Sequence, residues 1–335
     1  MNTVNIAIVG ATGMVGRKFI EVLEESSINI KHLYLYSSSR SSGTIISYNN
    51  NGIIVEELTE DNIKNKQIDY ALFSAGGSVS LAYAKVFTKY GAIVIDNSSA
   101  WRMDDSVPLI VPEVNMEDAF NHNGIIANPN CSTIQSVLPL EVLKKEYGLH
   151  SVSYATYQAV SGSGVNGVTD LKNTTKGKAP ICYPYKIYNN CIPHIDEFLD
   201  NGYTKEEIKM IFETRKILND PSLEVTATCV RVPVINSHSV EMHIELDNEF
   251  SIEDIKQLMK NKKGITLLDD PSKNIYPLAT IATGTNDVYV GRIRKDINNS
   301  KKLHLFCVAD NIRKGAATNA VQIVEALIER NEYNG

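Results

Sequence analysis

The first third of the chain alternates short apolar runs with amphipathic segments. The apolar runs have the length of strands and lie at Val4–Val9, Leu33–Tyr36, Tyr70–Phe73 and Ala92–Ile95. Two stretches between them show the spacing of a helix face, from Val15 to Glu25 and from Ser78 to Lys89. Because strands that alternate with helices form parallel sheets, this part predicts a Rossmann-like, doubly wound α/β domain.

After Cys131 the pattern changes to longer, partly alternating strands with few helices. The expected strands are Ser151–Val160, Leu223–Pro233, Ser239–Asp247, Asp287–Arg294 and Lys302–Ala309. The expected helices are Ser132–Tyr147, with Pro139 as a kink, Lys205–Leu218, which Thr204 and Glu207 would open as a capping box, and Ile252–Lys260. This pattern predicts an α+β domain with a mostly antiparallel sheet. Residues 161–178 are a glycine- and threonine-rich loop whose order the pattern leaves open.

A last amphipathic helix, Gly315–Arg330, is expected to pack back on the first domain. The domains would then be residues 1–130 with 315–335, and residues 131–314. A chain of 335 residues is long enough for two such domains.

Composition narrows the functional classes. Basic residues number 33 and acidic residues 39, a net charge of −6 that argues against a nucleic-acid or anionic-membrane binder. The chain shows neither a membrane-length apolar run nor a secretory leader pattern, so we expect a cytoplasmic protein. Five widely spaced cysteines without a Cys-x-x-Cys pair indicate a reducing compartment and no metal site. One cysteine could be reactive while Cys182, Cys191, Cys229 and Cys307 pack as small apolar residues.

A glycine turn between the first strand and helix predicts a dinucleotide site. It reads Gly10-Ala11-Thr12-Gly13-Met14-Val15-Gly16, and the N–H groups at the start of the following helix suit a pyrophosphate. An NAD site usually places an acid after the second strand, yet residues 34–42 contain none. Arg40 stands there with Ser38, Ser39 and Ser41, donors for a 2′-phosphate. We therefore predict NADP(H) rather than NAD.

Cys131 is expected at the N-terminus of a helix, after Asn128-Pro129-Asn130. The helix dipole there favours a thiolate, and the N–H groups of that first turn could form an oxyanion hole. A thiolate beside a nicotinamide indicates oxidoreduction through a thioester, which needs a proton carrier. His238, where a strand breaks into a polar turn, is the preferred candidate. His243 would lie on the opposite strand face, which argues against a metal pair with His238.

Five motifs, in order, resemble those of the aspartate-semialdehyde dehydrogenases. They are the glycine turn, Asn128-Pro129-Asn130-Cys131-Ser132-Thr133, Gln158-Ala159-Val160-Ser161-Gly162, Glu213-Thr214-Arg215-Lys216, and Arg231-Val232-Pro233 leading to His238. The resemblance spans nearly the whole chain. It implies NADP-dependent reductive dephosphorylation of β-aspartyl phosphate to aspartate semialdehyde, a step toward lysine, threonine, methionine and diaminopimelate.

The resemblance also implies roles for individual residues. Cys131 would be the acyl-thioester nucleophile, His238 the general acid/base, and Gln158 the side chain that orients the acyl intermediate. Substrate would be bound by Arg231 on the α-carboxylate, Glu213 on the amino group, Lys216 and Arg102 on the phosphate, and Asn130. The cofactor would be bound by Gly10, Thr12, Gly13, Met14, Val15, Arg40, Ser41, Ser161, Gly162 and Asn311.

Two other functions fit the residues. N-acetyl-γ-glutamyl-phosphate reductase resembles the same scaffold, but its substrate lacks the free amino group that Glu213 would bind. A non-catalytic NADP-binding sensor would use Cys131 as a redox switch. A phosphate-independent aldehyde dehydrogenase is a weaker candidate. We expect small-molecule substrates and no metal, and the resemblance implies a homodimer or homotetramer formed through the second domain.

Overall fold

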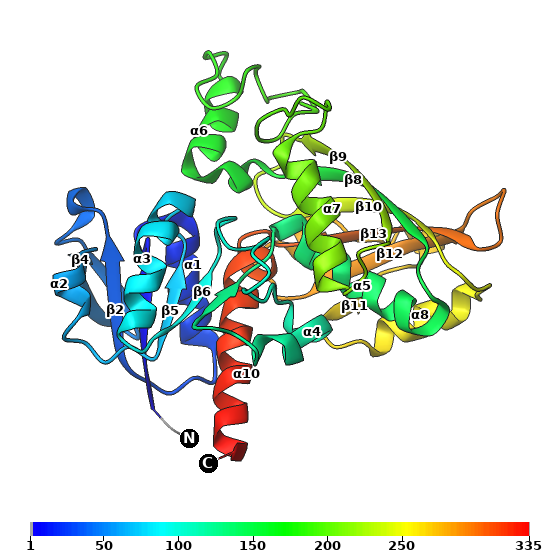
Figure 1. The fold of residues 1–335 in the computed structure, drawn as a ribbon. Coiled ribbons are helices and arrows are strands. Elements are labelled where there is room, and N and C mark those ends of the chain that lie inside the picture. The colour runs from blue at the N-terminus through cyan, green and yellow to red at the C-terminus, as the bar shows by residue number, and fades with distance from the viewer. Residues whose placement is uncertain (1–2, 335) are drawn as a thin grey trace. The chain divides into compact units, whose positions relative to one another are not determined.

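The computed structural model describes residues 3–334, which divide into two compact units. The first contains the described residues up to Pro129 and those from Ala316 onward, and the second is Asn130–Gly315. Residues 1, 2 and 335 of the expected first domain lie outside the described residues. Figure 1 shows each unit as a sheet with its own helices.

The first unit holds a seven-stranded sheet in the order β3-β4-β2-β1-β5-β6-β7. All pairs are parallel except β3 with β4. The six parallel strands follow the doubly wound dinucleotide-binding order, so the sequence-based fold class is confirmed. The elements are β1 Val4–Val9, α1 Met14–Glu25, β2 Ile30–Ser37, η1 Ser39–Ser41, β3 Ile45–Tyr48, β4 Asn51–Glu57, α2 Glu60–Ile63, β5 Tyr70–Phe73, α3 Gly77–Lys89, β6 Ile93–Asp96, α4 Pro112–Ala119, β7 Ile125–Ala127 and α10 Thr318–Asn334.

The expected strict alternation of strands and helices fails after β2. A β-hairpin, β3–β4, follows there instead of a helix. Asn49 and Asn50 turn the chain with φ of 48° and 63°, the left-handed pair that a two-residue type I′ turn needs. The run of asparagines before Gly52 was the sequence signal for this turn.

The core of the first unit combines strands, α1 and the C-terminal helix. Buried side chains of β1, β2 and β5 pack with Phe19 and Leu23 of α1 and with Val321, Val324 and Leu327 of α10. The apolar stripe of the last helix is therefore part of this core. A π-helical turn, Arg313–Ala317, comes directly before α10.

The second unit holds a six-stranded sheet in the order β11-β12-β13-β10-β8-β9. Three of its five pairs are antiparallel, so the expected mostly antiparallel sheet is confirmed. The elements are α5 Cys131–Tyr147, β8 Ser151–Gln158, η2 Val160–Ser163, α6 Gly164–Thr174, α7 Lys205–Ile217, β9 Glu224–Arg231, β10 His238–Glu245, α8 Ile252–Asn261, β11 Ile265–Leu267, η3 Pro271–Lys273, α9 Ala279–Ala282, β12 Val288–Lys295 and β13 Lys302–Ala309.

One face of the second sheet is covered by α5, α7 and α8, and the other face stays half-exposed. Burial alternates along β10, with His238 on the covered face and His243 on the half-exposed face. Helix α5 is the central element, since residues 132–143 are all buried, and it continues through Pro139. Thr204 and Glu207 form the expected capping box at the start of α7.

The segment 161–178 is mostly helical, in η2 and α6, rather than loop. The buried Asp170 carboxylate accepts hydrogen bonds from the backbone N–H groups of Ile181, Cys182 and Tyr183, which ties the following segment to α6. Among residues 3–334, no helix is both long and apolar enough to cross a membrane.

Candidate active site

Cys131 is the first residue of α5 and is partly exposed. Asn130 caps the helix, because its Oδ1 accepts from the N–H of Ser132 at 2.9 Å and of Thr133 at 3.3 Å. The position places the Cys131 sulfur at the positive end of the helix dipole, where a thiolate is stabilised.

The same cap corrects the expected oxyanion hole. The N–H groups of Ser132 and Thr133 already donate to the Asn130 side chain, so they are occupied by the protein itself. An asparagine at the N-cap position competes with any ligand for these donors. The cap therefore removes these two donors from the expected oxyanion hole.

Two buried glutamates hold the residues around Cys131. Glu213 Oε2 accepts from the backbone N–H of Asn130 at 2.6 Å. Glu206 Oε1 accepts from Asn130 Nδ2 at 2.8 Å and from Gln158 Nε2 at 3.2 Å. Asn130, Gln158 and Glu213 are thus joined in one network. Sequence reasoning missed Glu206, because an acid in the first turn of a helix is ordinarily read as a favourable dipole partner.

Glu206 stays charged inside this network. Burial acts to raise its pKa, but the Lys209 ammonium and the hydrogen bonds from Asn130 and Gln158 outweigh burial, so the pKa is lowered. The Lys209 Nζ lies 3.2 Å from Glu206 Oε2. A fixed carboxylate therefore orients the two amides on either side of it.

His238, the first residue of β10, is fully buried. Its Nδ1 accepts from the backbone N–H of Ala159 at 3.0 Å, which assigns the proton of the neutral ring to Nε2. Burial, with the nearby Arg231 charge, lowers the pKa of His238 well below its ordinary value. Among the described residues Nε2 has no hydrogen-bond partner. The ring is a neutral imidazole that can donate from Nε2.

The turn before His238 is held by Asn311. Ser237 has a φ of 72°, and its N–H donates to Asn311 Oδ1 at 2.9 Å. Asn311 Nδ2 also donates to Ser161 Oγ at 2.9 Å. Because a serine in the left-handed region costs free energy, the bond to Asn311 stabilises a conformation that places His238. Ser161 and Asn311 are therefore neighbours of the His238 turn.

Arg231, at the end of β9, is buried beside His238. Its Nη1 donates to the Ala159 carbonyl at 2.6 Å, and its Nε lacks a hydrogen-bond partner among residues 3–334. A Cβ at Gly162 would lie 2.8 Å from Arg231 Nη1 and 3.2 Å from His238 Nε2. Gly162 therefore borders both side chains, and any larger residue would displace them.

Gln135 connects the cysteine helix to His238. It follows Cys131 by one helical turn, on the same helix face. Its Nε2 donates to the His238 carbonyl at 3.1 Å and to the Cys307 carbonyl at 3.3 Å. The face of α5 that carries Cys131 therefore packs against β10. A glutamine inside an apolar helix was the signal that could have identified this residue.

The two predicted phosphate ligands, Lys216 and Arg102, belong to different units. Lys216 is partly exposed and follows Glu213 by three residues on α7. Arg102 belongs to the first unit, where its Nε donates to the Asn128 carbonyl and its Nη2 to the Asn97 carbonyl, both at 3.0 Å. These bonds hold the Arg102 guanidinium in one orientation after β6.

The glycine turn of the first unit is built for close approach. Gly10 has a φ of 87°, and a Cβ there would lie 2.9 Å from the Ser74 backbone. Gly10 and Ser74 directly follow the paired strands β1 and β5. A Cβ at Gly16 would lie 2.1 Å from the Gly10 oxygen. Gly13 is the N-cap of α1 and supplies no side-chain cap. A ligand anion can therefore cap this helix, with Met14 and Val15 in its first turn.

The loop after β2 carries the predicted 2′-phosphate donors. Arg40 is exposed and Ser41 half-buried in the 3₁₀ turn η1, directly beyond the carboxyl end of β2. Thr12 of the glycine turn and Ser37 of β2 share a hydrogen bond of 2.9 Å between their hydroxyls. The glycine turn and the Arg40 loop therefore lie side by side.

The burial of the cysteines differs from expectation. Cys229 and Cys307 are buried, and burial raises the pKa of both thiols, that of Cys307 to about 12. Cys182 and Cys191 are exposed, so the expectation that they pack in the core is wrong. They lie in the irregular segment between α6 and α7, which buries few of its side chains.

Comparisons with known proteins identify the family of the chain. Residues 5–122 match the family "Semialdehyde dehydrogenase, NAD binding domain", and residues 140–314 match "Semialdehyde dehydrogenase, dimerisation domain". The aspartate-semialdehyde dehydrogenase of Aquifex aeolicus is 50% identical over 97% of this chain and 98% of its own length. That of Bacillus subtilis is 49% identical over 98% of each chain.

Solved structures give the same relationship. The crystal structure of aspartate semialdehyde dehydrogenase II from Vibrio cholerae has a TM-score of 0.93 and 41% identity, and covers 98% of this chain and 99% of its own. A second structure of that enzyme is complexed with ASA. A Candida albicans aspartate semialdehyde dehydrogenase with NADP has a TM-score of 0.77 and 26% identity, covering 98% of this chain and 99% of its own. The chain belongs to the aspartate-semialdehyde dehydrogenase family.

Proposed function

We propose that the protein catalyses the NADP-dependent reductive dephosphorylation of L-4-aspartyl phosphate to L-aspartate 4-semialdehyde in amino-acid biosynthesis. One observation carries the proposal: Cys131 opens a helix whose next turn is bonded to the His238 backbone, in a chain half identical to known aspartate-semialdehyde dehydrogenases.

Cys131 is the nucleophile of the proposed reaction. Its thiolate, stabilised by the α5 dipole, attacks the acyl carbon of the acyl phosphate. A sulfur–carbon bond forms and the bond between the acyl carbon and the phosphate oxygen breaks, which releases phosphate and leaves a thioester on Cys131. After reduction, the carbon–sulfur bond breaks and regenerates the thiolate together with the aldehyde.

His238 acts through Nε2. The ring is neutral, and its Nδ1 is occupied by the Ala159 N–H. In this arrangement the imidazole offers a proton rather than a lone pair, so it donates to the oxygen of the tetrahedral intermediate. As a neutral ring, His238 stabilises the charge on this oxygen by a hydrogen bond from Nε2. The expected general acid/base role stays a prediction.

We assign substrate orientation to charged and amide side chains. Arg231 presents a planar guanidinium suited to the α-carboxylate, and Glu213, fixed to the Asn130 backbone, suits the ammonium. Gln158, held by Glu206, orients the acyl group. Arg102 and Lys216 supply positive charge for the phosphate.

The residues of the first unit fit a dinucleotide. The start of α1 has no side-chain cap, and the residues around it are Gly10, Thr12, Gly13, Met14 and Val15. Arg40 and Ser41 follow β2. From the second unit, Ser161, Gly162 and Asn311 would bind near His238. When bound, NADPH supplies the hydride that reduces the thioester. The Arg40 loop and the NADP-bound Candida albicans relative support NADP rather than NAD.

One assay tests the function. Purified protein is given L-aspartate 4-semialdehyde, NADP⁺ and phosphate, and NADPH formation is followed. We expect turnover that requires phosphate, and little turnover with N-acetylglutamate semialdehyde. Preference for the acetylated substrate would favour N-acetyl-γ-glutamyl-phosphate reductase. Phosphate-independent turnover would favour an ordinary aldehyde dehydrogenase, and no turnover would favour a redox sensor.

The assembly is proposed to be a homodimer or homotetramer. The match of residues 140–314 to a dimerisation domain supports this proposal. Gel filtration with light scattering should give a multiple of the 37.1 kDa chain mass.

A further inference from the structure

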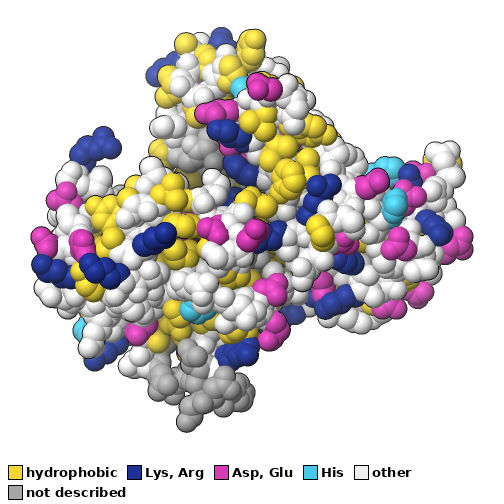
Figure 2. Space-filling view, in the orientation of Figure 1, with side chains coloured by type: hydrophobic (Ala, Val, Ile, Leu, Met, Phe, Trp, Pro, Cys, Tyr) yellow, Lys and Arg dark blue, Asp and Glu magenta, His cyan; other side chains and the backbone are white. Residues whose placement is uncertain are grey.

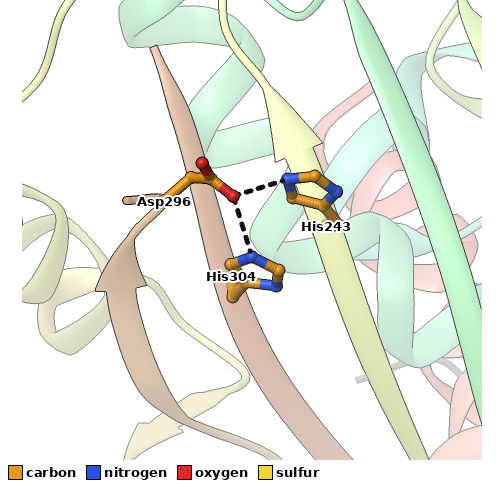
Figure 3. A group of neighbouring side chains, drawn as sticks. All are labelled: His243, Asp296 and His304. Carbon is orange, nitrogen blue, oxygen red and sulfur yellow. Dashed lines mark hydrogen bonds and ion pairs between the residues drawn. The ribbon is translucent and has the colours of Figure 1, made fainter. Parts of the chain in front are cut away.

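A cluster of two histidines and a carboxylate lies on the half-exposed face of the second sheet, opposite the face that carries His238. His243 of β10 and His304 of β13 are direct partners across the two strands, and Asp296 follows the end of β12. Their ligand atoms all lie within 4.8 Å of one another (Figure 3). In Figure 2, histidine and carboxylate side chains gather at the surface over the outer ends of these strands.

Strand pairing brings the three side chains together at one point. The Nε2 atoms of His243 and His304 each lie 3.4 Å from Asp296 Oδ2. An N–H···O hydrogen bond is ordinarily shorter, about 2.9 Å. A tetrahedral ion with bonds of about 2.0 Å separates its ligand atoms by about 3.3 Å. The spacing of 3.4 Å is long for the hydrogen bond between His304 and Asp296, and it is also close to the separation of two ligand atoms around such an ion.

Glu241 holds the far nitrogen of His304. Its Nδ1 lies 2.7 Å from Glu241 Oε1, and since a carboxylate only accepts, Nδ1 is the donor. In the neutral ring, Nε2 then presents a lone pair to the Asp296 carboxylate. A carboxylate that holds the far nitrogen of a metal-binding histidine is a recurrent feature of zinc sites.

The two rings lie against each other. The imidazoles stack with centroids 4.3 Å apart and planes 4° from parallel, so binding of one ion by both Nε2 atoms requires the rotation of one ring. His243 Nε2 is buried and lacks a hydrogen-bond partner among the described residues. The backbone N–H of Asn298 donates to Asp296 Oδ1 at 2.7 Å, which fixes the orientation of this carboxylate. The Arg294 guanidinium lies 3.9 Å from Glu241 and offsets one of the two negative charges.

An ion could reach this cluster from solvent. His243 also lines an open hollow of about 380 Å³ with Ser153, Thr226 and Lys302. Each of the three ligands is only partly buried. Three protein ligands leave one position for water in a tetrahedral site.

We propose that His243, His304 and Asp296 bind a divalent transition metal of the zinc class, with Glu241 fixing His304. The site would join β10, β13 and the turn that links β12 to β13. It shares none of its residues with the proposed active site. The spacing of His243 and His304 in the sequence does not indicate a metal pair, because only the β10–β13 register brings them together.

The test uses full-length protein stripped with EDTA and titrated with Co²⁺, followed by visible d–d absorption, and with Zn²⁺ in competition. All proteins carry Cys131→Ser, so that this thiolate contributes no metal ligand. The variants are His243→Gln, His304→Gln, Asp296→Asn and Glu241→Gln. His150→Gln, which changes an exposed histidine outside the cluster, is the control, and circular dichroism verifies folding.

We expect one Co²⁺ per chain without a thiolate charge-transfer band. Affinity should fall at least about tenfold in each ligand variant, fall about tenfold in Glu241→Gln, and stay unchanged in His150→Gln. Equal Co²⁺ binding by the parent and the ligand variants would overturn the proposal. So would a parent that binds neither Co²⁺ nor Zn²⁺, since the cluster would then hold protons only.

Discussion

Gln135 donates a hydrogen bond of 3.1 Å from its side-chain amide to the backbone carbonyl of His238. Cys131 stands one turn earlier on the same face of α5. The proposed nucleophile and the proposed proton donor are therefore positioned by a single helix turn and a single side chain. This relationship makes Gln135 a positioning residue.

Gln135→Leu should lower kcat by roughly 10- to 100-fold, because a shift of about 1 Å between reacting groups has an effect of that size. The variant should also lose about 1 to 2 kcal/mol in free energy of unfolding, since two buried carbonyls lose their donor. Steady-state kinetics and urea unfolding measure the two effects. A loss of stability with kcat unchanged would restrict Gln135 to a structural role.

Cys131→Ser should abolish nearly all turnover, because a serine hydroxyl is not ionised at neutral pH and the α5 dipole cannot make it a comparable nucleophile. NADP⁺ binding, measured by fluorescence titration, should be unchanged. Cys191→Ser, at an exposed cysteine, is the matched control and should keep full activity. Substantial turnover in Cys131→Ser would remove the thioester from the mechanism.

Local periodicity predicted most of the fold because each core-facing element shows its burial in its own sequence. The strands Val4–Val9, Tyr70–Phe73 and Lys302–Ala309 have the bounds that the apolar runs indicate. The β3–β4 hairpin and helix α6 were not predicted. Ile45 and Ile54 of the hairpin are exposed, and α6 depends on the Asp170 contacts to residues 181–183, so neither shows a clear periodic signal.

The candidate site was predictable only where chemistry shows in a short motif. The Cys131 motif and the glycine turn carry their function within a few residues. Glu206 and Gln135 act on partners distant in the sequence, Gln158 and His238, so their roles appear only once the chain is folded. The same holds for the cap by which Asn130 occupies the first N–H groups of α5.

His238 should make stability fall as the pH is lowered. Burial, with Arg231, lowers the pKa of His238 in the folded protein, whereas the unfolded chain takes up the proton near pH 6.5. Between these two values the unfolded state binds the extra proton, so the free energy of unfolding falls by up to about 1.4 kcal/mol per pH unit below pH 6.5. Urea unfolding at pH values between about 7.5 and 5 measures this slope, because histidine titrates in about this range.

His238→Gln is the control for this pH dependence of stability. The glutamine oxygen can still accept from Ala159, but it does not titrate in this range. The variant should lose less stability than the parent as the pH falls, and the difference should correspond to one proton. Parallel curves for the two proteins would mean that His238 does not titrate between the folded and unfolded states as proposed.

Arg231→Lys should raise the KM for aspartate semialdehyde by roughly 10- to 100-fold, because a lysine cannot make the two parallel bonds to the substrate carboxylate. The KM for NADP⁺ should change little. Arg215→Lys is the control, since Arg215 lies on α7 and bonds the Leu223 carbonyl. An unchanged substrate KM in Arg231→Lys would exclude Arg231 from the carboxylate site.

Arg40→Ala should raise the KM for NADP⁺ by roughly 10- to 100-fold, because the 2′-phosphate loses a charged hydrogen-bond donor. The KM for NAD⁺, which lacks that phosphate, should stay the same, so the ratio of the two kcat/KM values reports the contribution of Arg40. Lys31→Ala is the matched control, because Lys31 is also exposed but lies near the opposite end of β2. If the parent enzyme used NAD⁺ as well as NADP⁺, or if Arg40→Ala changed both KM values equally, Arg40 would not be the residue that selects the phosphorylated cofactor.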